Sequence, residues 1–188
     1  MSAHEIPLTL PLEPQVISTL RAGDLVSLTG VLYTGRDAAH ARFDALLNKG
    51  KPLPVSLAGQ TIFYVGPCPP PPGRPIGACG PTTSSRMDKY APRLLDLGLA
   101  AMLGKGPRSP AVHEAIIRNR AVYFAATGGA AQLLAQRVKS AEVCAFPDLL
   151  SEAVYRLEVE NFPAVVAIDS LGNDLYELGP RQYLDSLK

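Results

Sequence analysis

Four times along this chain, a run of apolar residues ends in glycine or hydroxyl residues that open a helix-like segment. Short strand-to-helix connections of this kind are typical of βαβ units, in which right-handed crossovers place neighbouring strands in parallel. The repeated junction therefore predicts a partly parallel sheet in the middle of the chain. The four junctions are Thr34–Arg36, Gly80–Thr83, Gly104–Gly106 and Thr127–Gly129.

The pattern around the junctions predicts a mixed α/β fold, and 188 residues suffice for one sizeable core, so we expect one domain spanning residues 1–188. Strands are expected at Ile6–Leu12 (an edge strand), Asp24–Tyr33, Thr61–Val65, Leu99–Leu103, Ala121–Ala126, Val138–Phe146, Leu157–Phe162 and Ala164–Asp169. Helices are expected at Gln15–Leu20, Arg36–Leu47, Thr82–Lys89, from Ala91, from the Ser109–Pro110 cap to Arg118, and at Ala130–Gln136 and Asp148–Arg156. A hairpin turn at Ser170–Asn173 is expected to lead into a strand at Leu175–Tyr176.

The balance of charge and the cysteine content exclude several classes of protein. A net charge of +1 gives no reason to expect nucleic acid or an anionic membrane surface as a partner. No apolar run reaches the roughly 18 residues of a membrane span, and the N-terminus does not resemble a secretory signal, so a cytoplasmic location is expected. Cys68, Cys79 and Cys144 are too few for a disulfide framework and lack the CxxC spacing of cluster ligands, so buried or loop thiols are expected.

A run of prolines lies between the first and second junctions. Residues 66–75 read GPCPPPPGRP and are expected to be extended and polyproline-like. A stiff connecting loop is the favoured interpretation, and a ligand for a proline-binding module is the alternative.

The stretch Gly77–Gly106 combines features that suit a small anion. Helix N-termini beyond the carboxyl ends of strands present unpaired N–H groups and the positive end of the helix dipole. Arg36, Arg86 and Lys105 can add three fixed positive charges, and Arg86 follows Thr82 by four residues, so both face one side if the first helical turn includes them. Two arginines can each bind one carboxylate through two hydrogen bonds, so this set of residues indicates a site for a small dianion. Ordinary turn chemistry with solvated arginines is the alternative.

Five motifs in this order resemble one known family. The chain is similar, from about Ile6 to Tyr176, to the β subunit of class I fumarate hydratase, the iron–sulfur hydro-lyase β or C-terminal domain that tartrate dehydratase shares. The segment GPTTSSRMD, with the family pattern GPTTxxRMD, is the most specific of the five. The motifs are Tyr33–His40, Gly80–Asp88, Gly104–Gly106, Thr127–Ala131 and Leu157–Pro163.

The resemblance implies a swivelling β/β/α fold and the reversible hydration of fumarate to (S)-malate. It also implies a [4Fe-4S] cluster that three cysteines of a separate α subunit hold, so no metal ligand is expected in this chain. The partners implied are that α subunit, in an α2β2 assembly, and a small dicarboxylate substrate.

By motif, the resemblance also assigns roles to individual residues. Arg36, Arg86 and Lys105 would bind the dicarboxylate. Thr82 would be the candidate base at the carbon that loses a proton, and its hydroxyl would need an acidic activating partner on the α chain. The candidates for a supporting role are His40, Thr83, Gly128 and Gly129.

Two alternatives accompany the fumarate assignment. Asp88 and the Thr127–Gly129 turn are typical of fumarase-like members, whereas tartrate-type β subunits resemble GPTTSMRME, so fumarate is favoured over L(+)-tartrate. The second alternative is a non-catalytic module of the same fold that binds an anion or assists assembly.

Overall fold

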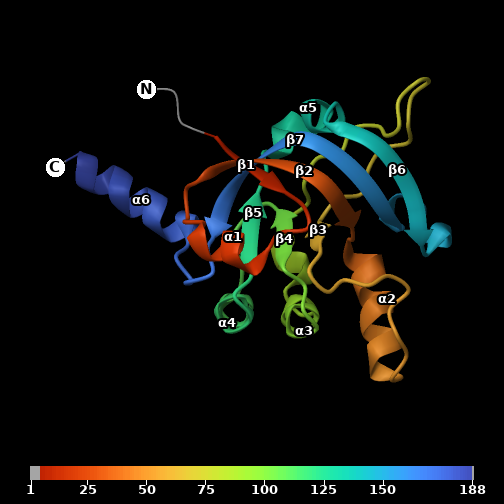
Figure 1. Cartoon of the computed structure of the whole chain (residues 1–188), viewed down its shortest axis with the longest axis horizontal. Helices are drawn as coiled ribbons and strands as arrows, with labels where there is room; N and C mark the ends of the chain where they lie inside the picture. Colours follow the sequence, from red (N-terminus) through yellow and green to blue (C-terminus); the bar gives the residue numbers. More distant parts are fainter. Residues whose placement is uncertain (1–4, 188) are drawn as a thin grey trace.

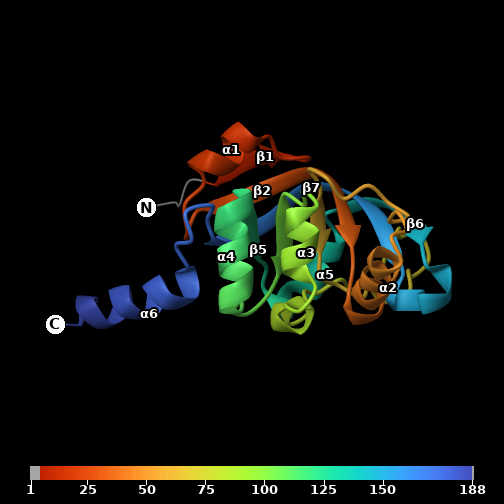
Figure 2. The same cartoon turned by 90° about the horizontal axis from the view of Figure 1, so that it is seen from below.

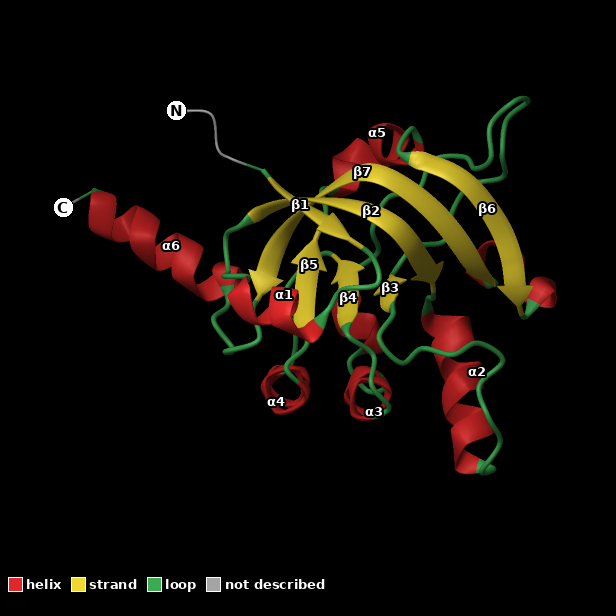
Figure 3. Cartoon of the chain, viewed as in Figure 1, coloured by secondary structure: helices red, strands yellow, loops and turns green. Residues whose placement is uncertain are grey.

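The computed structural model describes residues 5–187 as seven strands in a mixed sheet with helices mainly on one side, which confirms the predicted α/β class (Figures 1 and 3). The strands are β1 (Ile6–Thr9), β2 (Leu25–Thr34), β3 (Thr61–Phe63), β4 (Ala101–Gly104), β5 (Val122–Ala125), β6 (Val138–Ala145) and β7 (Val154–Ile168). The α-helices are α1 (Pro14–Thr19), α2 (Asp37–Asn48), α3 (Ala91–Asp96), α4 (Pro110–Asn119), α5 (Ala131–Ala135) and α6 (Leu175–Ser186). The 3₁₀ helices are η1 (Ser84–Met87), η2 (Gly128–Ala130) and η3 (Pro147–Glu152).

The sheet closes on itself through its longest strand. Its order is β1-β2-β3-β4-β5-β7-β6, and β2 pairs with β7 as well. Strands β2, β3, β4 and β5 run parallel, as the repeated junctions predict, whereas β7 runs antiparallel to β2, β5 and β6. Because β7 pairs with both β5 and β2, these five strands form a closed barrel. Strand β1 pairs with β2 as the expected edge strand.

Side chains of β3, β4 and β5 alternate between two cores, because successive residues of a strand point to opposite faces. Phe63, Leu103 and Phe124 point into the barrel and pack with apolar residues of β2 and β7. Met102 and Tyr123 belong to the second core, which α2, α3 and α4 cover. Figure 1 shows the three helices on the opposite side of β3–β5 from β2 and β7. This layering agrees with the β/β/α arrangement that the resemblance implies.

Two of the covering helices have a proline within their first two residues, which fits because the first helical residues have no intrahelical acceptor for their N–H groups. Pro110 opens α4 with Ser109 at the N-cap position, and Pro92 is the second residue of α3. The Ser109 side chain makes no capping hydrogen bond, so it caps α4 by position alone.

The C-terminal strand β7 corrects one prediction. The segments Leu157–Phe162 and Ala164–Asp169, predicted as two strands, form one strand that continues through Pro163. The N–H and C=O of Val166 point to the β2 side of β7. The backbone polar groups of successive strand residues point to alternate sides, and Pro163 is three residues from Val166, so its nitrogen points to the side of β7 away from β2. Within residues 5–187, no strand pairs with residues 161–164 on that edge, so the missing proline N–H is tolerated there.

A second correction concerns the predicted helix Asp148–Arg156. Only the short η3 forms there, because Phe146 and Leu150 adopt positive φ angles of 54° and 52° that interrupt a regular helix. From Val154 onward the residues belong to β7 and pair with β6. The β-branched and aromatic residues at this point, including Tyr155, favour a strand.

A third correction concerns the end of the chain. The turn at Ser170–Asn173 is present, with Gly172 at φ +88°, but Leu175–Tyr176 begins α6 and is not a strand. Asp174 provides the N-cap, and its carboxylate accepts the Tyr176 N–H at 2.8 Å. An aspartate at this position is a helix-start signal that outweighed the strand propensity of the following tyrosine.

Helix α6 extends away from the rest of the molecule (Figure 2). None of its side chains is buried. Among residues 5–187, no helix has the length and apolar character needed to cross a membrane.

Candidate active site

The residues predicted to bind the substrate follow the carboxyl ends of parallel strands. Thr34 of β2, Phe63 of β3 and Leu103 of β4 lie side by side in register. The segments that follow them therefore leave the sheet at the same end, the carboxyl ends of these parallel strands. Neighbouring strands are about 4.8 Å apart, which places the ends of β2 and β4 about 10 Å apart. Arg36 follows the first of these ends and Lys105 the last. Long basic side chains can meet across that span at a small dianion.

Arg36 lies at the N-cap position of α2, the strand-to-helix junction that the sequence predicts for it. Its Nη2 atom is 3.5 Å from Oε1 of Glu152, whose Oε2 accepts the Ala38 N–H at 2.9 Å. The guanidinium passes over Gly66, where a Cβ atom would lie 2.7 Å from Arg36 Nη1. A side chain larger than glycine would therefore displace Arg36 from its position over the sheet edge.

Asp37 holds the two predicted arginines together. Its Oδ1 accepts a hydrogen bond of 2.9 Å from Arg86 Nε, and its Oδ2 lies 3.9 Å from Arg36 Nε. The bond to Nε fixes the plane of the Arg86 guanidinium and leaves both Nη atoms without a recorded partner within residues 5–187. Two parallel N–H groups of this kind match the two oxygens of a carboxylate.

These ion pairs correct the expectation of three added positive charges. Asp37 and Glu152 balance Arg36 and Arg86, so of the three predicted basic residues only Lys105 has no ion-pair partner recorded among residues 5–187. The site is therefore less positive than the arginine and lysine count suggests. Its selectivity for an anion has to come from the orientation of donors more than from net charge.

Thr82 lies before the helix and not in its first turn. Its N–H donates to the Tyr64 carbonyl at 2.7 Å, and the residue is half-buried. The N-cap of η1 is Thr83, whose side chain makes no capping hydrogen bond. The condition under which Thr82 and Arg86 would face one side, that the first helical turn includes both, is therefore not met. No hydrogen bond of the Thr82 hydroxyl, to a carboxylate or to any other group, is recorded among residues 5–187.

Ser84 brackets the backbone of Lys105 on both sides. The Lys105 N–H donates to Ser84 Oγ at 3.0 Å, and the Lys105 carbonyl accepts the Ser84 N–H at 2.9 Å. Thr83 and Lys105 also form an isolated parallel β-bridge. A Cβ atom on Gly104 would lie 2.0 Å from Ser84 Oγ, so glycine is required there for this approach. The second and third junctions thus form one unit.

The fourth junction contributes Gly128 to the same place. A Cβ atom on Gly128 would lie 3.2 Å from the Lys105 ammonium, and one on Gly80 would lie 3.1 Å from the Gly128 carbonyl. Glycine at both positions therefore allows the two turns to close around Lys105. Nothing lies within 4 Å of a Cβ on Gly129, so close packing does not require glycine there, and its supporting role stays a prediction.

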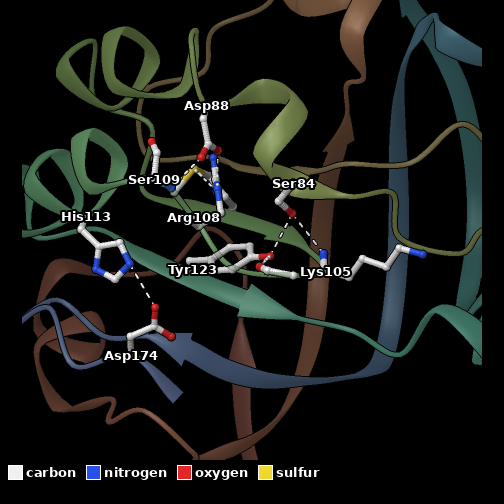
Figure 4. Close-up of polar contacts among 10 residues, drawn as sticks. Ser84, Asp88, Lys105, Arg108, Ser109, His113, Tyr123 and Asp174 are labelled. Atoms are coloured by element: carbon white, nitrogen blue, oxygen red, sulfur yellow. Dashed lines mark hydrogen bonds and ion pairs between the residues drawn. The ribbon is translucent and has the colours of Figure 1, made fainter. Parts of the chain in front are cut away.

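The Tyr123 hydroxyl binds the turn that contains Lys105 and Gly106. This hydroxyl is 2.8 Å from Ser84 Oγ and 2.9 Å from the Gly106 carbonyl (Figure 4). Burial raises the pKa of Tyr123, so the phenol keeps its proton. Because a carbonyl can only accept, the Tyr123 proton goes to Gly106 and the Ser84 hydroxyl donates to Tyr123.

Asp88, the last residue of the motif that begins at Gly80, has a structural task. It accepts hydrogen bonds from Arg108 Nε at 2.7 Å and from the Ser109 N–H at 2.6 Å (Figure 4). The buried Arg108 guanidinium lies 4.9 Å from the centre of the Tyr123 ring. Asp88 therefore ties η1 to the start of α4.

His40 is a fully buried neighbour of the Arg36 backbone. Its Nδ1 is 2.9 Å from the Arg36 carbonyl, which can only accept, so Nδ1 carries the proton. Burial, with a smaller contribution from the Arg108 charge, lowers the pKa of His40 to about 4 against the opposing effects of the Arg36 carbonyl and Asp37. His40 therefore stays neutral and holds the junction at Arg36 by a hydrogen bond.

The lowered pKa of His40 makes stability depend on pH. Its stabilising contribution is complete above the unfolded pKa of 6.5 and is lost as the pH falls toward the folded pKa of about 4. We expect the free energy of unfolding to fall by about 2 kcal/mol between pH 7 and pH 5 from this group. Urea unfolding of wild type and His40→Asn at both pH values measures the difference. Equal pH dependence in the two proteins would contradict the assignment.

The cysteines of this chain do not form a cluster site. Cys79 is buried, whereas Cys68 and Cys144 are exposed, and all three are free thiols. Burial raises the pKa of the Cys79 thiol to about 12, which disfavours the thiolate that iron requires. Within residues 5–187 there is no group of three or more His, Cys, Asp or Glu side chains arranged to hold a metal. These residues do not fit a [4Fe-4S] cluster.

Three residues that position the predicted ones were not singled out from the sequence. Asp37 had a signal, since a carboxylate directly after Arg36 at a helix start is well placed to bind an arginine. Ser84 lies inside the motif that begins at Gly80. Glu152 had no usable signal, because its segment was expected to be part of a longer helix.

The chain matches a known family over most of its length. The family model described as the fumarase C-terminus covers residues 1–179. The chain is 42% identical to "Fumarate hydratase class I, anaerobic" of Escherichia coli and 43% identical to "Fumarate hydratase 1, mitochondrial" of Leishmania major, in each case over 81% of this chain and 28% of the relative. It is 38% identical to "Putative L(+)-tartrate dehydratase subunit beta" of Methanocaldococcus jannaschii over 86% of both chains. The chain thus spans about a quarter of the length of the fumarate hydratases and most of the length of the tartrate dehydratase subunit beta.

Proposed function

This chain belongs to the fumarase C-terminus family, and we propose that it is the β subunit of a two-subunit hydro-lyase that reversibly hydrates fumarate to (S)-malate. The observation that carries the proposal is the pair Arg36 and Arg86, which one carboxylate, Asp37, holds together beside the turn that bears Lys105. A four-carbon dianion has two carboxylates to bind, and this group offers guanidinium forks and an ammonium at one edge of the sheet.

Each of these residues has a defined task in the proposal. Arg86 presents its two Nη atoms to one carboxylate while Asp37 keeps hold of Nε. Arg36 and Lys105 complete the binding of the dianion. Thr82, two residues before η1, accepts the proton that leaves carbon when malate is dehydrated, and returns it in the other direction. A threonine hydroxyl needs a base beside it for this step.

Neither an activating base for Thr82 nor a set of cluster ligands is recorded among residues 5–187, and the proposal takes both from a second polypeptide. We assign the [4Fe-4S] cluster and the carboxylate that activates Thr82 to an α subunit, in the expected α2β2 assembly. The name of the tartrate dehydratase relative, a subunit beta, supports a divided enzyme. One domain for residues 1–188 and a cytoplasmic location complete the proposal.

Co-expression with the α subunit tests the proposal. Prepared without oxygen, the complex should be brown and oxygen-sensitive and should hydrate fumarate, whereas the chain alone should be colourless and inactive. A complex that dehydrates L(+)-tartrate and ignores fumarate would contradict the substrate assignment.

The relative named as a tartrate dehydratase subunit favours that substrate as the second candidate. The non-catalytic alternative predicts that the chain binds malate tightly by itself. Titration of the chain with malate, in the absence of the α subunit, separates this alternative from the hydro-lyase.

A further inference from the structure

All four backbone polar groups of Lys105 and Gly106 have partners outside their own turn. Ser84 binds the N–H and the carbonyl of Lys105, and the Tyr123 hydroxyl binds the carbonyl of Gly106. The Gly106 N–H donates to the hydroxyl of Tyr176 at 2.8 Å. Surface turns commonly leave such groups to water, so this turn is held to an unusual degree.

The bond from Tyr176 acts on the same peptide unit as one of the bonds from Ser84. The Lys105 carbonyl, which accepts from Ser84, and the Gly106 N–H, which donates to Tyr176, lie on opposite edges of one planar group. A peptide plane held at both edges cannot rotate about its axis without breaking a hydrogen bond. Gly106 has a φ of +82°, so its own conformation offers no steric resistance to such a rotation.

Tyr176 comes from the anchored end of α6. Asp174 caps this helix and lies 3.0 Å from Nε2 of His113 on α4, as Figure 4 shows. A bridge between Ile168 and Asp174 ties the same point to the end of β7. The remainder of α6 extends away from the sheet (Figure 2). The first turn of α6 therefore has a fixed position from which its tyrosine reaches the turn after β4.

We propose that Tyr176 is a positioning residue for Lys105: its hydroxyl fixes the Lys105–Gly106 peptide plane and thereby aims the Lys105 ammonium at the substrate carboxylate. The part of this inference that concerns the substrate rests on the proposed function. The part that concerns the turn rests on the hydrogen bonds alone.

Kinetics of the complex with the α subunit test the first part. Lys105 binds a carboxylate in substrate and transition state alike, so loss of its alignment raises KM and leaves kcat nearly unchanged. For Tyr176→Phe we expect a KM for malate about two- to tenfold higher, the range for one lost hydrogen bond. Tyr183→Phe, the same change on the exposed part of the same helix, is the matched control and should behave as wild type.

Amide hydrogen exchange of the full chain tests the second part without any need for activity. We expect the Gly106 amide to exchange about two- to tenfold faster in Tyr176→Phe than in wild type or Tyr183→Phe. An unchanged Gly106 exchange rate overturns the inference, as does a lower kcat and unfolding temperature with unchanged KM. If the wild-type complex fails to hydrate fumarate, the proposed function fails, and the exchange experiment alone decides whether Tyr176 holds the turn.

Discussion

Arg86→Ala is expected to lower kcat/KM for fumarate by about 10²- to 10⁴-fold. The variant removes two charge-assisted hydrogen bonds to a substrate carboxylate, each worth about 1.5–3 kcal/mol. Steady-state kinetics of the complex with the α subunit measure the loss. Arg86→Lys keeps the charge but not the fork, so its activity should lie between those of Arg86→Ala and wild type.

Arg93→Ala is the matched control for this experiment. Arg93 binds Asp44 of α2 at 2.8 Å, just as Arg86 binds Asp37 of the same helix at 2.9 Å, and both arginines are similarly exposed. Exposed ion pairs contribute about 0–1 kcal/mol, so the two variants should have similar stability. Equal loss of activity in both, or wild-type turnover in Arg86→Ala, would contradict the assignment of Arg86.

Thr82→Val is the second variant with a large expected effect. Valine has nearly the same shape and keeps the N–H that binds the Tyr64 carbonyl, but it lacks the hydroxyl proposed to move the proton. We expect kcat to fall by about 10²- to 10⁴-fold, the usual contribution of a general base, with little change in KM. Thr82→Ser retains the hydroxyl and should recover part of kcat.

Ser85→Ala serves as the control for Thr82→Val. Ser85 is an exposed hydroxyl residue three positions along the same segment and should retain wild-type kcat. If Thr82→Val lowers thermal stability or raises KM while kcat stays near that of wild type, the hydroxyl does not transfer the proton.

Local sequence signals predicted the elements whose formation depends on nearby residues. The Ser109–Pro110 start of α4 and the apolar strands after each junction are examples, and their parallel order followed from the short connections. Strand β7 was divided wrongly at Pro163, because the fate of a proline N–H depends on which strand lies beside it. That neighbour is decided by the closure of the barrel and is not visible in the local sequence.

The same limit applies to the site. The motifs contained Arg36, Arg86 and Lys105, but they did not reveal that Asp37 joins the arginines or that Tyr176 binds the turn after Lys105. The Asp37–Arg86 and Gly106–Tyr176 contacts link residues that are distant in the chain, so they depend on the assembled fold. Residue types were thus predictable from the sequence, whereas the pairing of their charges was not.

Closure of the barrel also sets an order of events during synthesis. Strand β2 pairs with β7, which is the last strand of the sheet to be synthesised. The edge of β2 that binds β7 therefore stays unpaired until β7 has emerged. Until then the nascent chain exposes unpaired strand edges, which are prone to pair with other chains. The residues proposed to bind the substrate leave the ribosome before β7, and Glu152, the partner of Arg36, follows them directly ahead of that strand.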